Sequence, residues 1–166
     1  MHLRLVVVAL LPLLALSCGG GSKVPTFADS TEAAEAAARA MAGGDLEMAA
    51  AAFQKAAEAA DPKAKTAALS GLFQAYLMDG KSQEAIAAAQ RLIAEGGALV
   101  DSPMLKGLAD AAIVERNAEV AHAVIDAAVA KFPAAKADYA KALQAVDLLK
   151  TQGAGADLSS LGYTGD

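Results

Sequence analysis

The sequence predicts an all-α fold in which about three helix-turn-helix repeats are followed by a C-terminal capping helix. Three observations support this prediction. More than a quarter of the 166 residues are alanine, the residue with the highest helix propensity. Apolar residues recur at helical spacing along most of the chain. The same series of small and bulky residues returns about every 36 residues between residues 43 and 133.

Residues 1–17, MHLRLVVVALLPLLALS, predict a secretory leader that is cleaved from the mature chain. His2 and Arg4 precede an apolar stretch of about a dozen residues, and Ser17 ends the segment with a small side chain. The stretch contains Pro12 and is well short of the ~20 residues that a membrane-spanning helix needs. A permanent transmembrane anchor is therefore the weaker interpretation.

Cys18 is the single cysteine of the chain and follows the leader directly. The stretch ALSC resembles the lipobox of bacterial lipoproteins, in which a signal peptidase cuts before a cysteine that carries a diacylglyceryl group. The resemblance implies a mature chain that begins at an acylated Cys18, although Ala15 stands where most lipoboxes have leucine. Two or three acyl chains would anchor it firmly, because each buried CH₂ contributes about 0.8 kcal/mol. The alternatives are an ordinary leader with an incidental thiol, or a free reactive cysteine.

Residues 18–30 are predicted to form a flexible tether, because GGGSKVPTFADS is rich in glycine and serine at first and has no periodic apolar face. The first helix is expected over roughly residues 31–43, where Asp29 and Glu32 have the spacing of a capping box. Its apolar side is nearly all alanine apart from Met41.

The second helix of each repeat is expected within segments 43–62, 79–97 and 116–133. These helices share a small residue at one recurring position, then a residue four places later and another three places beyond, all on one helical face. The three series are Ala49, Phe53 and Ala56; Ala85, Ala89 and Leu92; and Ala121, Ile125 and Ala128.

The partner helices are expected over residues 63–78 and 103–115, the latter with Ser102 as N-cap and Pro103 at the first helical position. Both carry one apolar stripe. The stripes are Leu69, Leu72, Phe73 and Tyr76, and then Leu105, Leu108, Ala109 and Ala112.

The end of the array needs a cover, because a helical hairpin leaves one apolar face open. Residues 134–150 are predicted to be that capping helix, with Tyr139, Leu143, Val146 and Leu149 on one stripe. The repeat domain would then span residues 31–150. Residues 151–166 lose this periodicity and gain glycine, which predicts a disordered tail.

The pattern resembles the tetratricopeptide repeat, which has leucine and aromatic positions on its first helix, a small-xxx-bulky-xx-small series on its second and a closing proline. The resemblance covers about residues 31–133, and the third unit, which ends at Pro133, matches most fully. The period is about two residues longer than the family's 34, and Gly96-Gly97 replaces the second closing proline. The resemblance implies a right-handed solenoid that presents a concave face to another protein.

In tetratricopeptide arrays the first helices build the concave face, which implies a partner-binding groove here. Met41, Leu77 and Ile113 are expected to be exposed apolar anchors of that groove. Of the lysine and asparagine pattern with which some family members clamp a peptide carboxylate, only Lys106 is present, so such a clamp is not expected. The alternative is that these are merely tolerated surface positions. By register the predicted groove residues are Met41, Ser70, Gln74, Leu77, Lys106, Asp110 and Ile113.

Charge and motif content argue against several function classes. A net charge of −5 does not favour nucleic acid or anionic lipid headgroups as partners. His122 is expected to be a solvated residue on the outer face, and no motif for a metal, a phosphate or an activated nucleophile accompanies it. We therefore expect no enzyme activity, no cofactor and no metal.

The predicted function is that of a lipoprotein, attached to the membrane through its N-terminal lipid, that scaffolds a cell-envelope assembly by binding another envelope protein or peptide. The alternative is a periplasmic accessory subunit or substrate-binding module that a partner holds at the membrane. Gly19 follows the cysteine where many inner-membrane lipoproteins have aspartate, which favours the periplasmic face of the outer membrane.

Acylation of Cys18 predicts a mature protein heavier than residues 18–166 by a diacylglyceryl group or more. Mass spectrometry of the purified protein measures this difference. The Cys18→Ala variant should accumulate as unprocessed precursor. An unmodified Cys18 thiol in the mature protein would rule out the lipoprotein interpretation.

Overall fold

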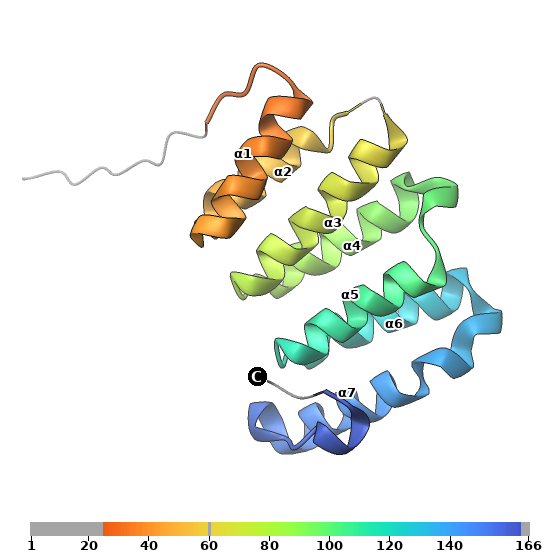
Figure 1. The fold of residues 1–166 in the computed structure, drawn as a ribbon. Helices are drawn as coiled ribbons and strands as arrows, with labels where there is room; N and C mark the ends of the chain where they lie inside the picture. Colours follow the sequence, from red (N-terminus) through yellow and green to blue (C-terminus); the bar gives the residue numbers. More distant parts are fainter. Residues whose placement is uncertain (1–24, 60, 164–166) are drawn as a thin grey trace, which may run out of the picture.

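The computed structural model describes residues 25–59 and 61–163, and within these residues the fold is all-α (Figure 1). The predicted leader, Cys18 and the first part of the predicted tether lie outside the described residues. Seven α-helices occupy the described part, together with short 3₁₀ helices η1 to η4. The α-helices are α1 (Ser30–Gly43), α2 (Leu46–Ala56), α3 (Pro62–Met78), α4 (Ser82–Glu95), α5 (Ser102–Val114), α6 (Ala118–Lys131) and α7 (Ala140–Gln152).

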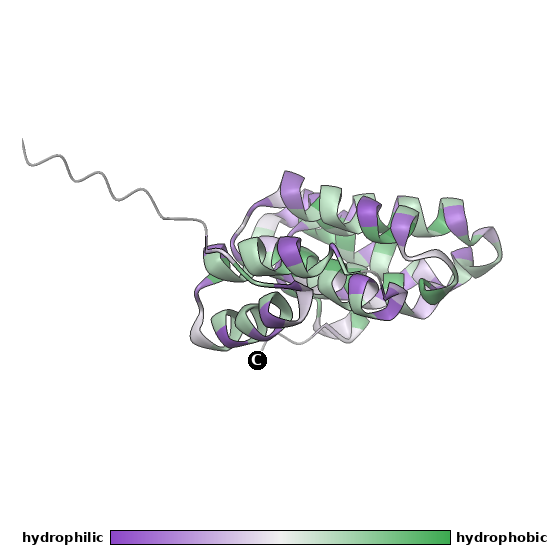
Figure 2. Cartoon of the chain, turned by 90° about the horizontal axis from the view of Figure 1, so that it is seen from above, coloured by the Kyte–Doolittle hydropathy of each residue, from purple (hydrophilic) through white to green (hydrophobic). Residues whose placement is uncertain are grey.

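Consecutive helices pair into three hairpins, α1 with α2, α3 with α4 and α5 with α6, and α7 packs against the third. Figure 1 shows α1, α3 and α5 in a front row and the fainter α2, α4 and α6 behind them. Each helix visible in Figure 2 carries both hydrophilic and hydrophobic residues. Buried residues from all seven α-helices form one core cluster.

Aspartate side chains cap the N-termini of α1, α2, α3 and α5. Asp29 accepts hydrogen bonds from the Thr31 and Glu32 amides at 2.8 and 2.9 Å, which confirms the predicted cap of α1. The Glu32 carboxylate reaches the amide of Ala28 at 2.6 Å rather than that of Asp29. The predicted N-cap at residue 102 is wrong by one position, because the side chain of Asp101 caps α5. The observed helix, Ser102–Val114, is shifted by only one residue from the predicted range 103–115. A difference of this size is within the usual uncertainty of helix ends.

The recurring alanines lie on the buried side of the second helices. Ala49, Ala85 and Ala121 are each fully buried. A methyl group at such a position lets a neighbouring helix approach closely. The burial that the register predicts for these three alanines is therefore confirmed.

The first two hairpins pack closely because a phenyl ring meets a glycine. A Cβ placed on Gly71 of α3 would lie 2.4 Å from the Phe53 ring of α2. At the equivalent positions of the next interface stand Ala89 and Gly107, and a Cβ on Gly107 would meet nothing within 4 Å. The second and third hairpins instead meet mainly through α4 and α6.

Hydrogen bonds join α4 and α6 near their N-termini. The Asn117 amide donates to the Ser82 hydroxyl at 2.8 Å, and the Gln83 amide donates to the Glu119 carboxylate at 2.6 Å. The second interface therefore has a polar component, and it leaves the C-terminal parts of α3 and α5 with little direct contact.

The C-terminal helix begins later than predicted, at Ala140, because Pro133–Tyr139 forms the 3₁₀ helix η2. Tyr139 is buried, and its hydroxyl donates to the Ser102 carbonyl at 2.9 Å. This anchor ties the segment before α7 to the start of α5. The predicted packing of Tyr139, Val146 and Leu149 is confirmed.

The prediction of a disordered tail is wrong for residues 151–163. The chain continues after α7 through η3 (Gly153–Gly155) and η4 (Ser159–Leu161). Ala156 is buried, and Leu158 is only 1% exposed. One buried leucine in a glycine-rich stretch produces no periodic pattern, although it packs into the core.

The folded part also begins earlier than predicted, before residue 30. Phe27 packs against the core, and Asp29 caps α1. Residues 25–30 are therefore part of the folded unit rather than of the tether. Within the described ranges, no helix combines the length and the apolar character needed to cross a bilayer.

The crossing alanines predict a sharp contrast between two tryptophan variants of α4. Ala85→Trp should lower the free energy of unfolding by about 1 to 3 kcal/mol, because the indole forces apart two helices in contact. Ala87→Trp, at an exposed position of the same helix, should cost well under about 1 kcal/mol. Denaturant melts followed by circular dichroism compare the two, and equal effects would contradict the register.

Candidate functional site

Two of the predicted apolar anchors are wrong, because their side chains belong to the core. Leu77 is 4% exposed and Ile113 is 0% exposed. A helix turns by about 100° per residue, so an error of one position exchanges a buried for an exposed side chain. The next residues, Met78 and Val114, are 52% and 50% exposed. These two are the apolar side chains that face solvent at the ends of α3 and α5.

Three of the other predicted groove residues, Met41, Ser70 and Gln74, come from α1 and α3. Met41 is half-buried against the core, and Ser70 is half-buried and does not line the hollow near Met78 that is described below. Gln74 is exposed and lies near Met78. The structure thus brings only part of the predicted set together.

A hollow of about 230 Å³ lies between the C-terminal parts of α3 and α5. We call it the α3–α5 hollow. Its volume is below that of most small-molecule pockets, which hold roughly 300 to 1,000 Å³. Its walls are mostly apolar, with Glu115 as the charged member. The lining residues are Gln74, Leu77, Met78, Ala111, Val114 and Glu115.

Lys106 and Asp110 form an ion pair along α5, with 2.6 Å between Nζ and Oδ2. The other oxygen of Asp110 accepts a hydrogen bond from the Tyr163 hydroxyl at 2.6 Å. Burial, together with the Asp110 carboxylate, raises the pKa of Tyr163 above its ordinary value. The end of the chain therefore already occupies this part of the predicted groove.

Arg116 is a site residue that sequence reasoning missed. It stands in the turn between α5 and α6 with φ of 58°, where the two preceding hairpins have Gly44 and Gly80 at 75° and 70°. A left-handed conformation costs a non-glycine residue about 1 kcal/mol or more. The Arg116 guanidinium donates to the Ala156 carbonyl at 2.6 Å. The loss of glycine at its repeat position is the sequence signal that could have identified it.

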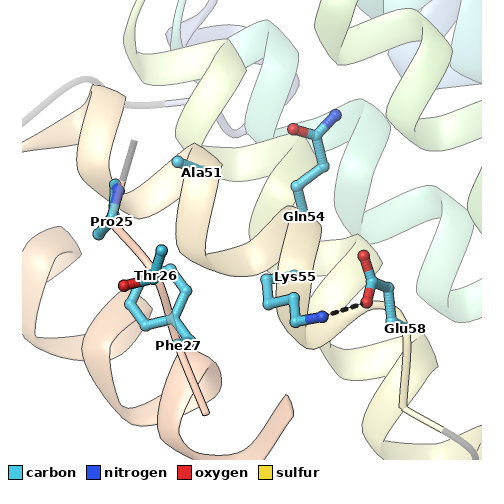
Figure 3. A pocket seen from close by; sticks show the side chains of 7 residues that line it. All are labelled: Pro25, Thr26, Phe27, Ala51, Gln54, Lys55 and Glu58. Carbon is cyan, nitrogen blue, oxygen red and sulfur yellow. Dashed lines mark hydrogen bonds and ion pairs between the residues drawn. The ribbon is translucent and has the colours of Figure 1, made fainter. Parts of the chain in front are cut away.

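A second hollow, of about 400 Å³, lies beside the N-terminal segment Pro25–Phe27 and α2 (Figure 3). Figure 3 shows Lys55 and Glu58 joined by their ion pair on the opposite wall. Both charges are therefore paired with each other and do not point together at a ligand.

The outer face of α4 and α6 carries a third hollow, of about 570 Å³, that is lined by His122 among others. The His122 side chain is partly exposed, as expected, and its Nδ1 lies 3.3 Å from the Asp126 carboxylate. In the part of the chain that the structure describes, no three or more His, Cys, Asp or Glu residues are placed to hold a metal ion.

Comparisons with protein-family models, with curated proteins and with solved structures found no match for this chain. The chemistry of the site is therefore argued from its residues alone. These residues form an apolar hollow between α3 and α5. Beside it, the Asp110 carboxylate and the Arg116 guanidinium bind Tyr163 and Ala156 of the segment after α7.

The raised pKa of Tyr163 predicts a pH-dependent contribution to stability. The folded state favours the neutral phenol, whereas the unfolded chain ionises near pH 10. The stabilisation is therefore fully present below about pH 10 and is lost as the pH rises toward the higher folded-state pKa. The difference in Tm between the wild type and Tyr163→Phe should be constant from pH 7 to 9 and shrink above pH 10. A difference that grows in alkali would contradict this assignment.

Proposed function

We propose that this protein is a lipid-anchored lipoprotein with tetratricopeptide-like repeats that serves as a non-enzymatic scaffold in a bacterial cell-envelope assembly. The finer fold that goes with this proposal is a right-handed solenoid. The two rows of helices and the buried alanine at each crossing support it. The leader and the ALSC stretch support the lipid anchor at Cys18.

The anchor and the folded domain are close together along the chain. Among the described residues, which begin at Pro25, Phe27 is the first large side chain that packs against the core. The residues from Cys18 to Pro25 extend no further than about 25 Å, at 3.3 to 3.6 Å per residue. An acylated Cys18 would thus hold the domain next to the membrane surface, where it meets other envelope proteins.

The α3–α5 hollow is the observation that carries the proposed binding function. Met78 and Val114 occupy equivalent positions of successive repeats, and both expose half of their apolar surface. A partner that covers exposed apolar side chains lowers the free energy of the complex, because apolar surface is removed from water. The hollow is too small for most cofactors but accommodates one side chain of a protein segment.

The proposed occupant is an apolar side chain from a helical or extended segment of another envelope protein. Glu115 at the edge of the hollow favours a segment that also carries a lysine or arginine. Such an edge charge acts mainly on the association rate and its salt dependence, whereas the apolar contact sets the dissociation rate.

The test is crosslinking in intact envelopes with the full-length protein. Met78→Ser combined with Val114→Ser should abolish capture of the partner and leave Tm nearly unchanged, because both side chains are already half in water. Leu99→Ser is the matched control, since Leu99 is an exposed leucine of η1 outside the hollow. Capture that survives the double substitution would exclude the hollow as the binding site.

Attachment is tested separately with Cys18→Ser. Loss of the protein from the membrane fraction supports the lipid anchor. Retention in that fraction would instead support attachment through a partner.

A further inference from the structure

The segment after α7 lies against α5 and α7 as a ligand would, although it belongs to the same chain. We call residues 153–163 the C-terminal strap. Figure 1 shows this dark blue segment folded back beside α7. It is held by three anchors: the Ala156 carbonyl on Arg116, the buried side chain of Leu158, and the Tyr163 hydroxyl on Asp110.

Most of the strap is exposed, although Leu161 and Tyr163 also pack against the core. Its two 3₁₀ helices have three residues each. A hydrogen bond from the Tyr163 amide to the Leu158 carbonyl, 3.2 Å long, closes the last loop on itself. Segments with few buried side chains open at lower free energy than the core around them. We therefore expect the strap to open at a lower free energy than the helices.

The receiving surface belongs to the folded repeats. Arg116 adopts a backbone conformation that glycine has in the other two turns, and from there its guanidinium reaches the strap. Lys106 pairs with Oδ2 of Asp110, and the other carboxylate oxygen, Oδ1, accepts the hydrogen bond from the Tyr163 hydroxyl. The Arg116 guanidinium donates to a main-chain carbonyl and the Asp110 carboxylate accepts from a hydroxyl, so the pair suits a turn-forming peptide segment that carries a tyrosine.

The strap site adjoins the proposed partner site. Asp110 lies one helical turn before Val114, which lines the α3–α5 hollow, so these two residues share one face of α5. A segment that follows this face of α5 would pass from the hollow to the strap site. The end of the chain therefore covers one part of a continuous surface.

We propose that the surface formed by Asp110, Arg116 and the part of the core that buries Leu158 is a peptide-binding site, which the C-terminal strap of the same chain occupies. A partner segment with the same anchors, an apolar side chain followed five residues later by a tyrosine, displaces the strap. The partner half of this proposal rests on the proposed function, whereas occupation by the strap does not.

The test uses the full-length protein and the chain's own sequence as the probe. A fluorescein-labelled peptide of residues 153–166, GAGADLSSLGYTGD, is titrated against the wild type and a release variant, Leu158→Ser with Tyr163→Phe. Fluorescence anisotropy should show at least tenfold tighter binding to the release variant, because its own strap no longer competes. A peptide with the same two substitutions should bind at least tenfold more weakly than the native peptide.

Ser160→Ala is the matched control protein, since Ser160 is an exposed strap residue. It should exclude the peptide as the wild type does. A release variant that still melts in one cooperative transition but binds neither peptide would overturn the proposal. A release variant that unfolds would also overturn it, because the strap would then be part of the cooperative core.

Hydrogen exchange of the unmodified wild type provides a second measurement. Strap amides should exchange at least tenfold faster than those in the middle of α7. Exchange of both segments at one common rate would contradict a detachable strap. Neither measurement needs an envelope partner, so failure here is distinguishable from failure of the crosslinking test on the α3–α5 hollow.

Discussion

The close approach of two helices at a buried alanine is the constraint on which the rest of this structure depends. An alanine-rich chain has little apolar area per residue, so it gains from packing only where backbones nearly touch. Ala49, Ala85 and Ala121 permit that approach once in each hairpin. The bulkier side chains, such as Leu72 and Leu108, then fill the space that remains. A larger residue at any crossing would cost its neighbours their contacts as well.

The repeated elements were predictable because their signal is local and occurs three times. Leu92 and Ala128 lie at equivalent places on one helical face, and both are buried. Leu77 and Ile113 stand four residues after Phe73 and Ala109 of the predicted stripes, so helical spacing alone places them on the buried side. They were misplaced because the groove was assigned from the register of the tetratricopeptide family rather than from these stripes.

The strap could not be predicted from local sequence at all. Leu158, Leu161 and Tyr163 are the only large side chains among the small and polar residues of the strap, too few to show a helical period, although all three pack in or against the core. The anchors Asp110 and Arg116 precede the strap by about 40 residues or more. Only the replacement of glycine at the third turn pointed to this region. A departure from the repeat was thus more informative about the site than the repeat itself.

The unequal interfaces between hairpins have a consequence for cooperativity. In a linear array, each unit is stabilised by its own folding and by coupling to its nearest neighbours. Phe53 against Gly71 couples the first two hairpins strongly, whereas Gly107 has no such partner. We therefore expect weaker coupling between the second and third hairpins than between the first and second. Unfolding under heat or force should then begin at the boundary between α4 and α6.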